Sequence, residues 1–331
     1  MSMTSVLQSV EQFQLREAIS LRLGVNIESV LLYREQSEFL TELLKNFYTP
    51  SCRLLAAAPR IPEIAIAADS ADVKLIDVYL DQPFVGDFQP IAKCLESARD
   101  MVYLANPNRM SSVTYATSQL KELASKISQG LLIIDEYYHD FSKISAISLL
   151  KTCQNLIILR PFESWITAGQ IEAGFTLISA GLAHNIEYAS QQISLDRLTA
   201  RKGFEIFCSE NSTRKQTGQI QAMSLQLATA LSRWGVRCQV CPSNFILIEV
   251  NNPAAVQCLL AERNLKVMRL GGDNQLEKYL RFQISTPDKN GQLIEAFSQM
   301  PQFLLNSPGK EFNRLEKKAV IGSDIEKTMV G

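Results

Sequence analysis

Short aliphatic runs alternate with amphipathic stretches over the first 180 residues. Two clear runs are Leu131–Asp135 and Leu156–Arg160, and each ends in polar residues. Runs of this length are typical of buried parallel strands. Strands are predicted at 29–32, 53–58, 73–79, 100–105, 131–135, 156–160 and 173–179, with helices at 6–23, 37–46, 62–69, 88–99, 115–129 and 146–152. This alternation predicts an α/β fold with a doubly wound, mostly parallel sheet.

The pattern changes after residue 190. A long helical stretch is predicted at 192–234, and it precedes a set of shorter elements. These are strands at 236–240, 245–250, 266–269 and 279–285 and helices at 253–263 and 289–304. We therefore expect a large α/β domain over 25–205, a small α+β domain built from 1–24 and 206–305, and a polar tail over 306–331.

Composition excludes several classes of protein. The chain has 331 residues, 46% of them hydrophobic, and a net charge of −1. No basic cluster suggests nucleic acid, no apolar run approaches the roughly 20 residues of a membrane helix, and the N-terminus does not resemble a secretory signal. The seven cysteines lie in apolar segments and predict reduced core residues. No residue set predicts a metal site. We expect a cytoplasmic protein.

Polar residues follow two of the predicted strands. Asp135-Glu136-Tyr137-Tyr138 follows the first, and Arg160-Pro161-Phe162-Glu163-Ser164 follows the second. Residues beyond the carboxyl ends of strands form the ligand crevice in open α/β sheets. The order of strands and motifs from about residue 9 to 304 resembles the fold-type-I aminotransferases of class I/II, in particular the histidinol-phosphate aminotransferase branch.

The resemblance implies roles for several residues. Members use pyridoxal phosphate (PLP) and are homodimers. Asp135 matches the acid that pairs with the pyridinium nitrogen, and Tyr138 matches the tyrosine at the phenolate oxygen. Arg281 matches the arginine that binds the substrate carboxylate. Ser164 occupies the position of the lysine that bonds to the cofactor.

The chain departs from the family pattern at the remaining contacts. Arg109 replaces an asparagine that binds the phenolate oxygen. Glu35 lies in a phosphate loop that has no glycine, Glu163 replaces a hydroxyl, and Glu172 replaces an arginine. At about 6 Å and an effective dielectric near 20, each of these three carboxylates would repel phosphate by several kcal/mol. We therefore expect that PLP is not held in the family's manner.

Two functional hypotheses follow. The first is a degenerate aminotransferase homologue without PLP-dependent transamination, which binds a small amino-acid-like or cationic ligand or acts as a pathway partner. The carboxylates and Arg109 would then contact this ligand. The alternative is an active PLP enzyme, or a related enzyme of amino-acid metabolism, with relocated cofactor contacts. Hydrolase chemistry by Ser164 with His139 has no supporting nucleophile-elbow motif.

Overall fold

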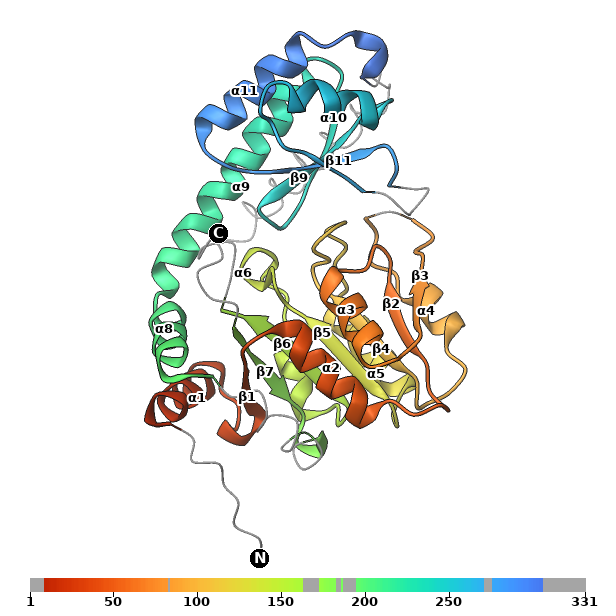
Figure 1. Ribbon diagram of the computed structural model, residues 1–331, viewed down its shortest axis with the longest axis vertical. Helices are drawn as coiled ribbons and strands as arrows, with labels where there is room; N and C mark the ends of the chain where they lie inside the picture. Colours follow the sequence, from red (N-terminus) through yellow and green to blue (C-terminus); the bar gives the residue numbers. More distant parts are fainter. Residues whose placement is uncertain are drawn as a thin grey trace, which may run out of the picture. The chain divides into compact units, whose positions relative to one another are not determined.

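The computed structural model describes residues 9–82, 84–162, 173–182, 186, 195–270 and 276–305. The chain divides into two compact units (Figure 1). The first contains residues 1–221, 242–244 and 272–275, and the second contains 222–241, 245–271 and 276–331. The predicted boundary at residue 205 stays a prediction, and α1 (Val10–Leu23) groups with the first unit.

The first unit is built on a seven-stranded sheet with strand order β1-β7-β6-β5-β4-β2-β3. Strand β7 runs antiparallel to both of its neighbours, and the other pairs are parallel. The bounds are β1 Val30–Tyr33, β2 Leu54–Ala57, β3 Leu75–Val78, β4 Met101–Ala105, β5 Leu131–Asp135, β6 Leu156–Pro161 and β7 Gly174–Ile178. This confirms the predicted α/β fold with a mostly parallel sheet.

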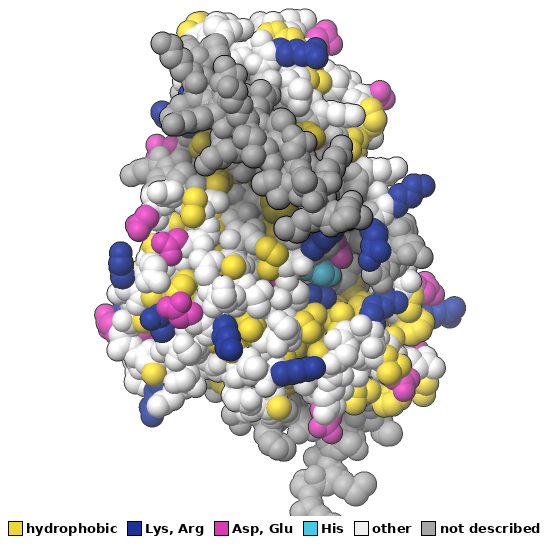
Figure 2. All heavy atoms as spheres, turned by 180° about the vertical axis from the view of Figure 1, so that it is seen from behind, with side chains coloured by type: hydrophobic (Ala, Val, Ile, Leu, Met, Phe, Trp, Pro, Cys, Tyr) yellow, Lys and Arg dark blue, Asp and Glu magenta, His cyan; other side chains and the backbone are white. Residues whose placement is uncertain are grey.

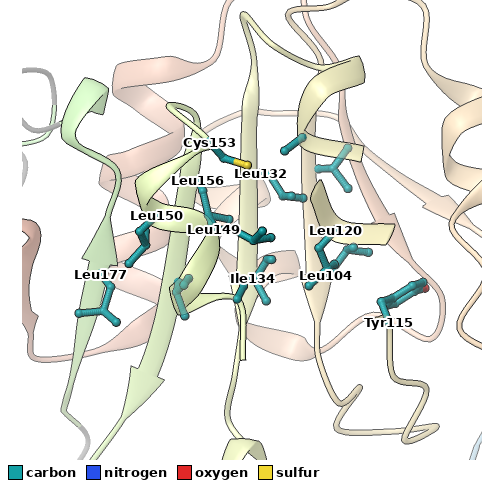
Figure 3. Close-up of a cluster of buried hydrophobic side chains, with 14 of the residues drawn as sticks. Leu104, Tyr115, Leu120, Leu132, Ile134, Leu149, Leu150, Cys153, Leu156 and Leu177 are labelled. Atoms are coloured by element: carbon teal, nitrogen blue, oxygen red, sulfur yellow. The ribbon is translucent and has the colours of Figure 1, made fainter. Parts of the chain in front are cut away.

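Alternating strand residues feed a separate core on each face of the sheet. Leu132 and Ile134 of β5 lie in one cluster, while Leu131 and Ile133 lie in the other. Figure 3 shows the first cluster, where these two β5 side chains lie among residues such as Leu104. Because both faces are buried, the strands are apolar throughout rather than alternating, which explains the continuous runs in the sequence.

Helices cover both cores. Residues of α2 (Gln36–Phe47) and α3 (Pro62–Ser70) belong to one cluster. Residues of α1, α4 (Gln89–Cys94), α5 (Thr117–Lys126) and α8 (Arg197–Cys208) belong to the other. Shorter helices are α6 (His139–Ser142) and three 3₁₀ turns at Ile27–Ser29, Ile147–Lys151 and Ala180–Leu182.

The second unit contains a four-stranded antiparallel sheet with order β10-β11-β9-β8. Its strands are β8 Arg237–Val240, β9 Phe245–Glu249, β10 Met268–Arg269 and β11 Tyr279–Gln283. The helices α10 (Pro253–Ala261) and α11 (Pro287–Ser298) follow β9 and β11 in the chain, and a 3₁₀ turn spans Gln302–Leu304. This confirms the predicted small α+β layer; the 306–331 tail lies outside the described residues.

Several predicted helices differ from the observed ones, and for two of them a side chain explains the difference. The stretch 192–234 contains two helices, α8 and α9 (Glu210–Ser232), separated at Ser209, whose hydroxyl donates back to the carbonyl of Ile206. The helix predicted over 88–99 ends at Cys94, because the Asp100 carboxylate accepts the backbone N–H groups of Glu96 and Ser97 in a turn. Such local side-chain bonds compete with helix formation.

All seven cysteines are free thiols, but Cys94, Cys208 and Cys258 are exposed. The predicted core location is therefore wrong for these three, which lie on helices at positions that face solvent.

Within the described residues, no helix is long and apolar enough to cross a membrane. Figure 2 shows one face, on which hydrophobic side chains lie among charged ones of both signs. Cytoplasmic location and a homodimer stay predictions.

Gly174, the first residue of β7, pairs with Tyr33 of β1 and leaves room for the Tyr33 ring. A Cβ at Gly174 would lie 2.3 Å from the Tyr33 hydroxyl oxygen and 2.6 Å from the Arg160 carbonyl oxygen. We predict that Gly174→Ala lowers the free energy of unfolding by about 1–3 kcal/mol, measured by urea denaturation. Gly218→Ala in α9, where a Cβ meets nothing within 4 Å, should instead be neutral or stabilising by up to about 1 kcal/mol. Equal effects of the two substitutions would contradict this packing argument.

Candidate functional site

A cavity of about 250 Å³ lies in the first unit, where the parallel strands end. Tyr33 closes β1, Pro161 closes β6, and Arg109 and Tyr137 follow β4 and β5. The complete lining among the described residues is Tyr33, Glu35, Gln36, Ser37, Pro62, Glu63, Ile66, Arg109, Tyr137, Pro161 and Ala173. This is the position in which open α/β sheets bind ligands.

Asp135 ends β5 and is completely buried. Its Oδ2 accepts hydrogen bonds from the Tyr103 hydroxyl at 2.8 Å and the Gln36 side-chain amide at 2.9 Å. Its Oδ1 accepts the backbone N–H of Tyr137 at 3.0 Å. Burial, together with the charge of Asp135, raises the pKa of Tyr103 well above its ordinary value, so the phenol remains a proton donor. The carboxylate is thus bound by three donors of the chain itself.

Arg109 brings a positive charge to this carboxylate. Its Nη2 lies 2.7 Å from Glu63 Oε2 and 3.6 Å from Asp135 Oδ2. Its guanidinium carbon lies 4.7 Å from the centroid of the Tyr137 ring. Burial alone would lower the pKa of Arg109, but the carboxylates of Asp135 and Glu63 raise it above its ordinary value. Arg109 is therefore a permanent cation in contact with the cavity.

Asparagine side chains hold the turn that carries Arg109. The Asn106 side chain accepts the backbone N–H of Tyr115 at 2.8 Å and donates to its carbonyl at 3.2 Å. Asn108 Oδ1 accepts the N–H groups of Met110 and Ser111, and its amide donates to the Pro59 carbonyl at 3.1 Å. These bonds connect the ends of β4 and β2 and fix the backbone on both sides of Arg109.

Tyr138 is buried one residue beyond Tyr137, and its hydroxyl donates to Asn244 Oδ1 at 2.8 Å. Asn244 belongs to the first unit. Tyr138, like Asp135, therefore already has a hydrogen-bond partner within the protein.

A second ion pair lies beside the site and is fully enclosed. Glu136 Oε2 accepts from Arg160 Nε at 2.9 Å and Nη2 at 2.7 Å, and Ser145 donates to the same oxygen at 3.0 Å. Burial and the nearby Arg160 charge lower the pKa of His139 well below its ordinary value. Neither Glu136 nor Arg160 lines the cavity, so this pair acts as internal support for the ends of β5 and β6.

Glu35 lies at the N-cap position of α2 and is exposed at the cavity. It accepts a hydrogen bond from the Ser37 hydroxyl and makes no side-chain cap. An acid at this end of a helix is stabilised by the helix dipole. The structure thus places one of the predicted acidic residues at the cavity.

The described structure does not place the remaining predicted site residues at the cavity. Glu163, Ser164 and Glu172 lie outside the described residues. Arg281 lies on β11 of the second unit, where its guanidinium carbon is 4.1 Å from the centroid of the Phe245 ring. Its role as a carboxylate clamp stays a prediction.

Sequence reasoning missed three residues of the site. Gln36 and Tyr103 donate to Asp135, and Glu63 pairs with Arg109. Strand alternation could have placed Tyr103 on the face that carries α2, because it lies two residues before the end of β4. Glu63 is the second residue of α3, directly after the end of β2 and the turn that follows it, so it also lies at a strand's carboxyl side.

Comparison with known proteins identifies the family. The model of aminotransferase class I and II matches residues 11–297. The chain belongs to this family.

Its relatives include histidinol-phosphate aminotransferases. It is 27% identical to histidinol-phosphate aminotransferase 1 of Carboxydothermus hydrogenoformans over 87% of this chain and 82% of the relative. It is 25% identical to the histidinol-phosphate aminotransferase of Parabacteroides distasonis over 87% of this chain and 85% of the relative. This makes the chain a histidinol-phosphate aminotransferase-like member of class I/II.

A solved structure with the same fold is the histidinol-phosphate aminotransferase of Clostridium acetobutylicum. Its TM-score is 0.78 at 18% identity, covering 88% of this chain and 90% of that chain. Another is the histidinol-phosphate aminotransferase from Sinorhizobium meliloti in complex with pyridoxal-5'-phosphate, with a TM-score of 0.77, 16% identity and coverage of 88% and 83%. These likenesses show the fold.

Two features of the described residues at the cavity do not suit the cofactor of that last complex, namely the cation beside Asp135 and the lack of a lysine. The Asp135 carboxylate already accepts three hydrogen bonds and lies 3.6 Å from Arg109 Nη2, so a pyridinium cation there would lie close to a cation that the chain itself supplies. The sequence contains no lysine between Lys151 and Lys202, and both of these are exposed. No lysine is among the described residues that line the cavity.

The hydrogen bond from Tyr103 to Asp135 can be tested directly. Tyr103→Phe removes one donor from a buried carboxylate and should lower the free energy of unfolding by about 1.5–3 kcal/mol in urea denaturation. Tyr115→Phe is the matched control, because the buried Tyr115 hydroxyl has no hydrogen-bond partner among the described residues. It should change stability by less than about 0.5 kcal/mol. A loss in Tyr115→Phe as large as that in Tyr103→Phe would contradict the assignment.

Proposed function

We propose that this class I/II aminotransferase homologue does not carry out PLP-dependent transamination and instead binds a small cationic or amino-acid-like molecule. The binding site is the cavity at the ends of β1, β2, β4, β5 and β6. A role as a partner within a biosynthetic pathway is compatible with such binding.

The proposal rests on the contacts that Asp135 already makes within the protein. Arg109 Nη2 lies 3.6 Å from its Oδ2, and its oxygens accept hydrogen bonds from Gln36, Tyr103 and the Tyr137 backbone. A hydrogen bond to a charged group contributes about 1.5–3 kcal/mol, so a ligand that displaced one of these donors would gain little. The absence of a lysine over 152–201 removes the covalent bond that would compensate for this.

The charge of the cavity favours a cationic ligand. Glu35, Glu63 and the underlying Asp135 give three negative charges, and Arg109 gives one positive charge, which leaves a surplus of two negative charges. At about 6 Å and an effective dielectric near 20, one such surplus charge attracts a cation by about 3 kcal/mol. The same charges repel a phosphate dianion.

Incubation with pyridoxal phosphate tests the loss of cofactor chemistry. We expect no visible absorption band from lysine-bound pyridoxal and no pyridoxyl-labelled lysine at or near the cavity after borohydride reduction and peptide mass spectrometry. A single labelled lysine, together with transamination activity that reduction abolishes, would instead establish the active enzyme with relocated contacts.

Ligand charge can be tested with a matched pair of probes. Because the relatives are named for histidinol phosphate, we compare L-histidinol with L-histidinol phosphate, and add 1,4-diaminobutane as a simple dication. Isothermal titration calorimetry should show L-histidinol and the diamine binding at least about tenfold more tightly than the phosphate ester. Tighter binding of the phosphate ester would contradict the proposed ligand class.

Variants then locate the binding site. Glu35→Gln removes a carboxylate at the cavity and should weaken diamine binding roughly tenfold, because one attractive charge is lost. Glu28→Gln is the control, since Glu28 lies at the other end of β1 from Tyr33. Arg281→Ala tests the carboxylate clamp with L-histidine as the probe. Equal diamine affinities in Glu35→Gln, Glu28→Gln and wild type would exclude this cavity as the site.

A further inference from the structure

We propose that Arg109 is a built-in counter-cation that occupies the place of a flat ligand cation at Asp135 and closes the inner end of the cavity. The proposal rests on the proposed function, because it explains why the site binds no pyridinium ring. It predicts that the position accepts a free flat cation once the Arg109 side chain is removed.

The first observation is the position of the guanidinium. It lies against Asp135 and Glu63 and over the face of the Tyr137 ring, and Arg109, Glu63 and Tyr137 all line the cavity. The Arg109 side chain is 15% exposed, whereas Asp135 is completely buried. A planar, delocalised cation on an aromatic face resembles a protonated heteroaromatic ring in shape and charge.

The second observation is the way in which Arg109 is held. Although Nη2 lies 2.7 Å from Glu63, neither Nε nor Nη2 makes a well-directed hydrogen bond to a described residue. Charge and stacking on the ring therefore hold the guanidinium, and no fork of directed bonds fixes it. Such a place is not specific for guanidinium and suits other flat cations.

The Arg160–Glu136 pair shows the contrast. There, two guanidinium nitrogens donate to one carboxylate oxygen, and the pair is enclosed and does not line the cavity. Two directed hydrogen bonds from one guanidinium suit arginine better than other flat cations. The two arginines thus serve different purposes: Arg160 is internal support, and Arg109 is part of the wall of the cavity.

Removal of the Arg109 side chain should leave a vacant cation position. Asp135 and Glu63 would remain in place, held by Gln36, Tyr103 and the start of α3. An uncompensated buried charge destabilises the fold, and a cation that enters from the cavity would restore stability by binding only the folded state.

The experiment is chemical rescue followed by thermal unfolding. Arg109→Ala should lower the melting temperature by on the order of 5 °C. N-methylpyridinium chloride at millimolar concentration should then raise the melting temperature of Arg109→Ala by about 2 °C or more relative to potassium chloride at the same concentration. Wild type, in which the Arg109 side chain fills this position, should show a clearly smaller increase. Arg109→Lys keeps the positive charge but lacks the planar guanidinium group. N-methylpyridinium should therefore stabilise Arg109→Lys less than Arg109→Ala.

Two controls separate the possible outcomes. Arg34→Ala removes an exposed arginine paired with Glu38 and should respond to N-methylpyridinium as wild type does. If Arg109→Ala does not fold, Arg109→Gln, which keeps most of the side-chain volume without the charge, is measured against the same criterion. An absence of rescue, or equal rescue in wild type and Arg34→Ala, would overturn the counter-cation proposal. The pyridoxal phosphate test on wild type does not depend on this result, so a failure of the counter-cation proposal can be distinguished from a failure of the proposed function.

Discussion

The buried negative charge of Asp135 is the constraint on which the rest of the site depends. A carboxylate without exposure to water must be hydrogen-bonded and neutralised, because an isolated buried charge is costly. In this chain the donors come from three elements: Gln36 of α2, Tyr103 of β4 and the backbone after β5. Arg109 supplies the positive charge. Asp135 is therefore hydrogen-bonded and lies beside a cation before any ligand binds.

The fold brings these groups together because the parallel strands all end at one edge of the sheet. Glu63, Arg109 and Asp135 belong to segments that follow or end β2, β4 and β5, which are neighbours in the sheet although their residues are far apart in the sequence. The turn at Asn106 and Asn108 fixes Arg109, and Gly174 gives room to Tyr33 beside it. Both features position side chains that line the cavity.

Much of the fold could be predicted from sequence, because buried parallel strands are continuous aliphatic runs. The predicted strand over 131–135 matches β5, and the fold class is confirmed. Helix ends were less predictable where one side chain decides them, as Asp100 does after Cys94 and Ser209 does between α8 and α9. The motif after β5 identified Asp135 as a candidate, and comparison with the family pattern identified Arg109. Their pairing, and the contributions of Gln36 and Glu63, depend on strand order and side-chain direction, which no local sequence pattern specifies.

A crystal structure of the protein soaked with pyridoxal phosphate would test the central claim most directly. The account predicts that Arg109 stays against Asp135 and Glu63 over the Tyr137 ring, and that no cofactor density appears at the end of β5. A pyridine nitrogen within hydrogen-bonding distance of Asp135, with Arg109 displaced and the phosphate bound at the start of α2, would contradict it.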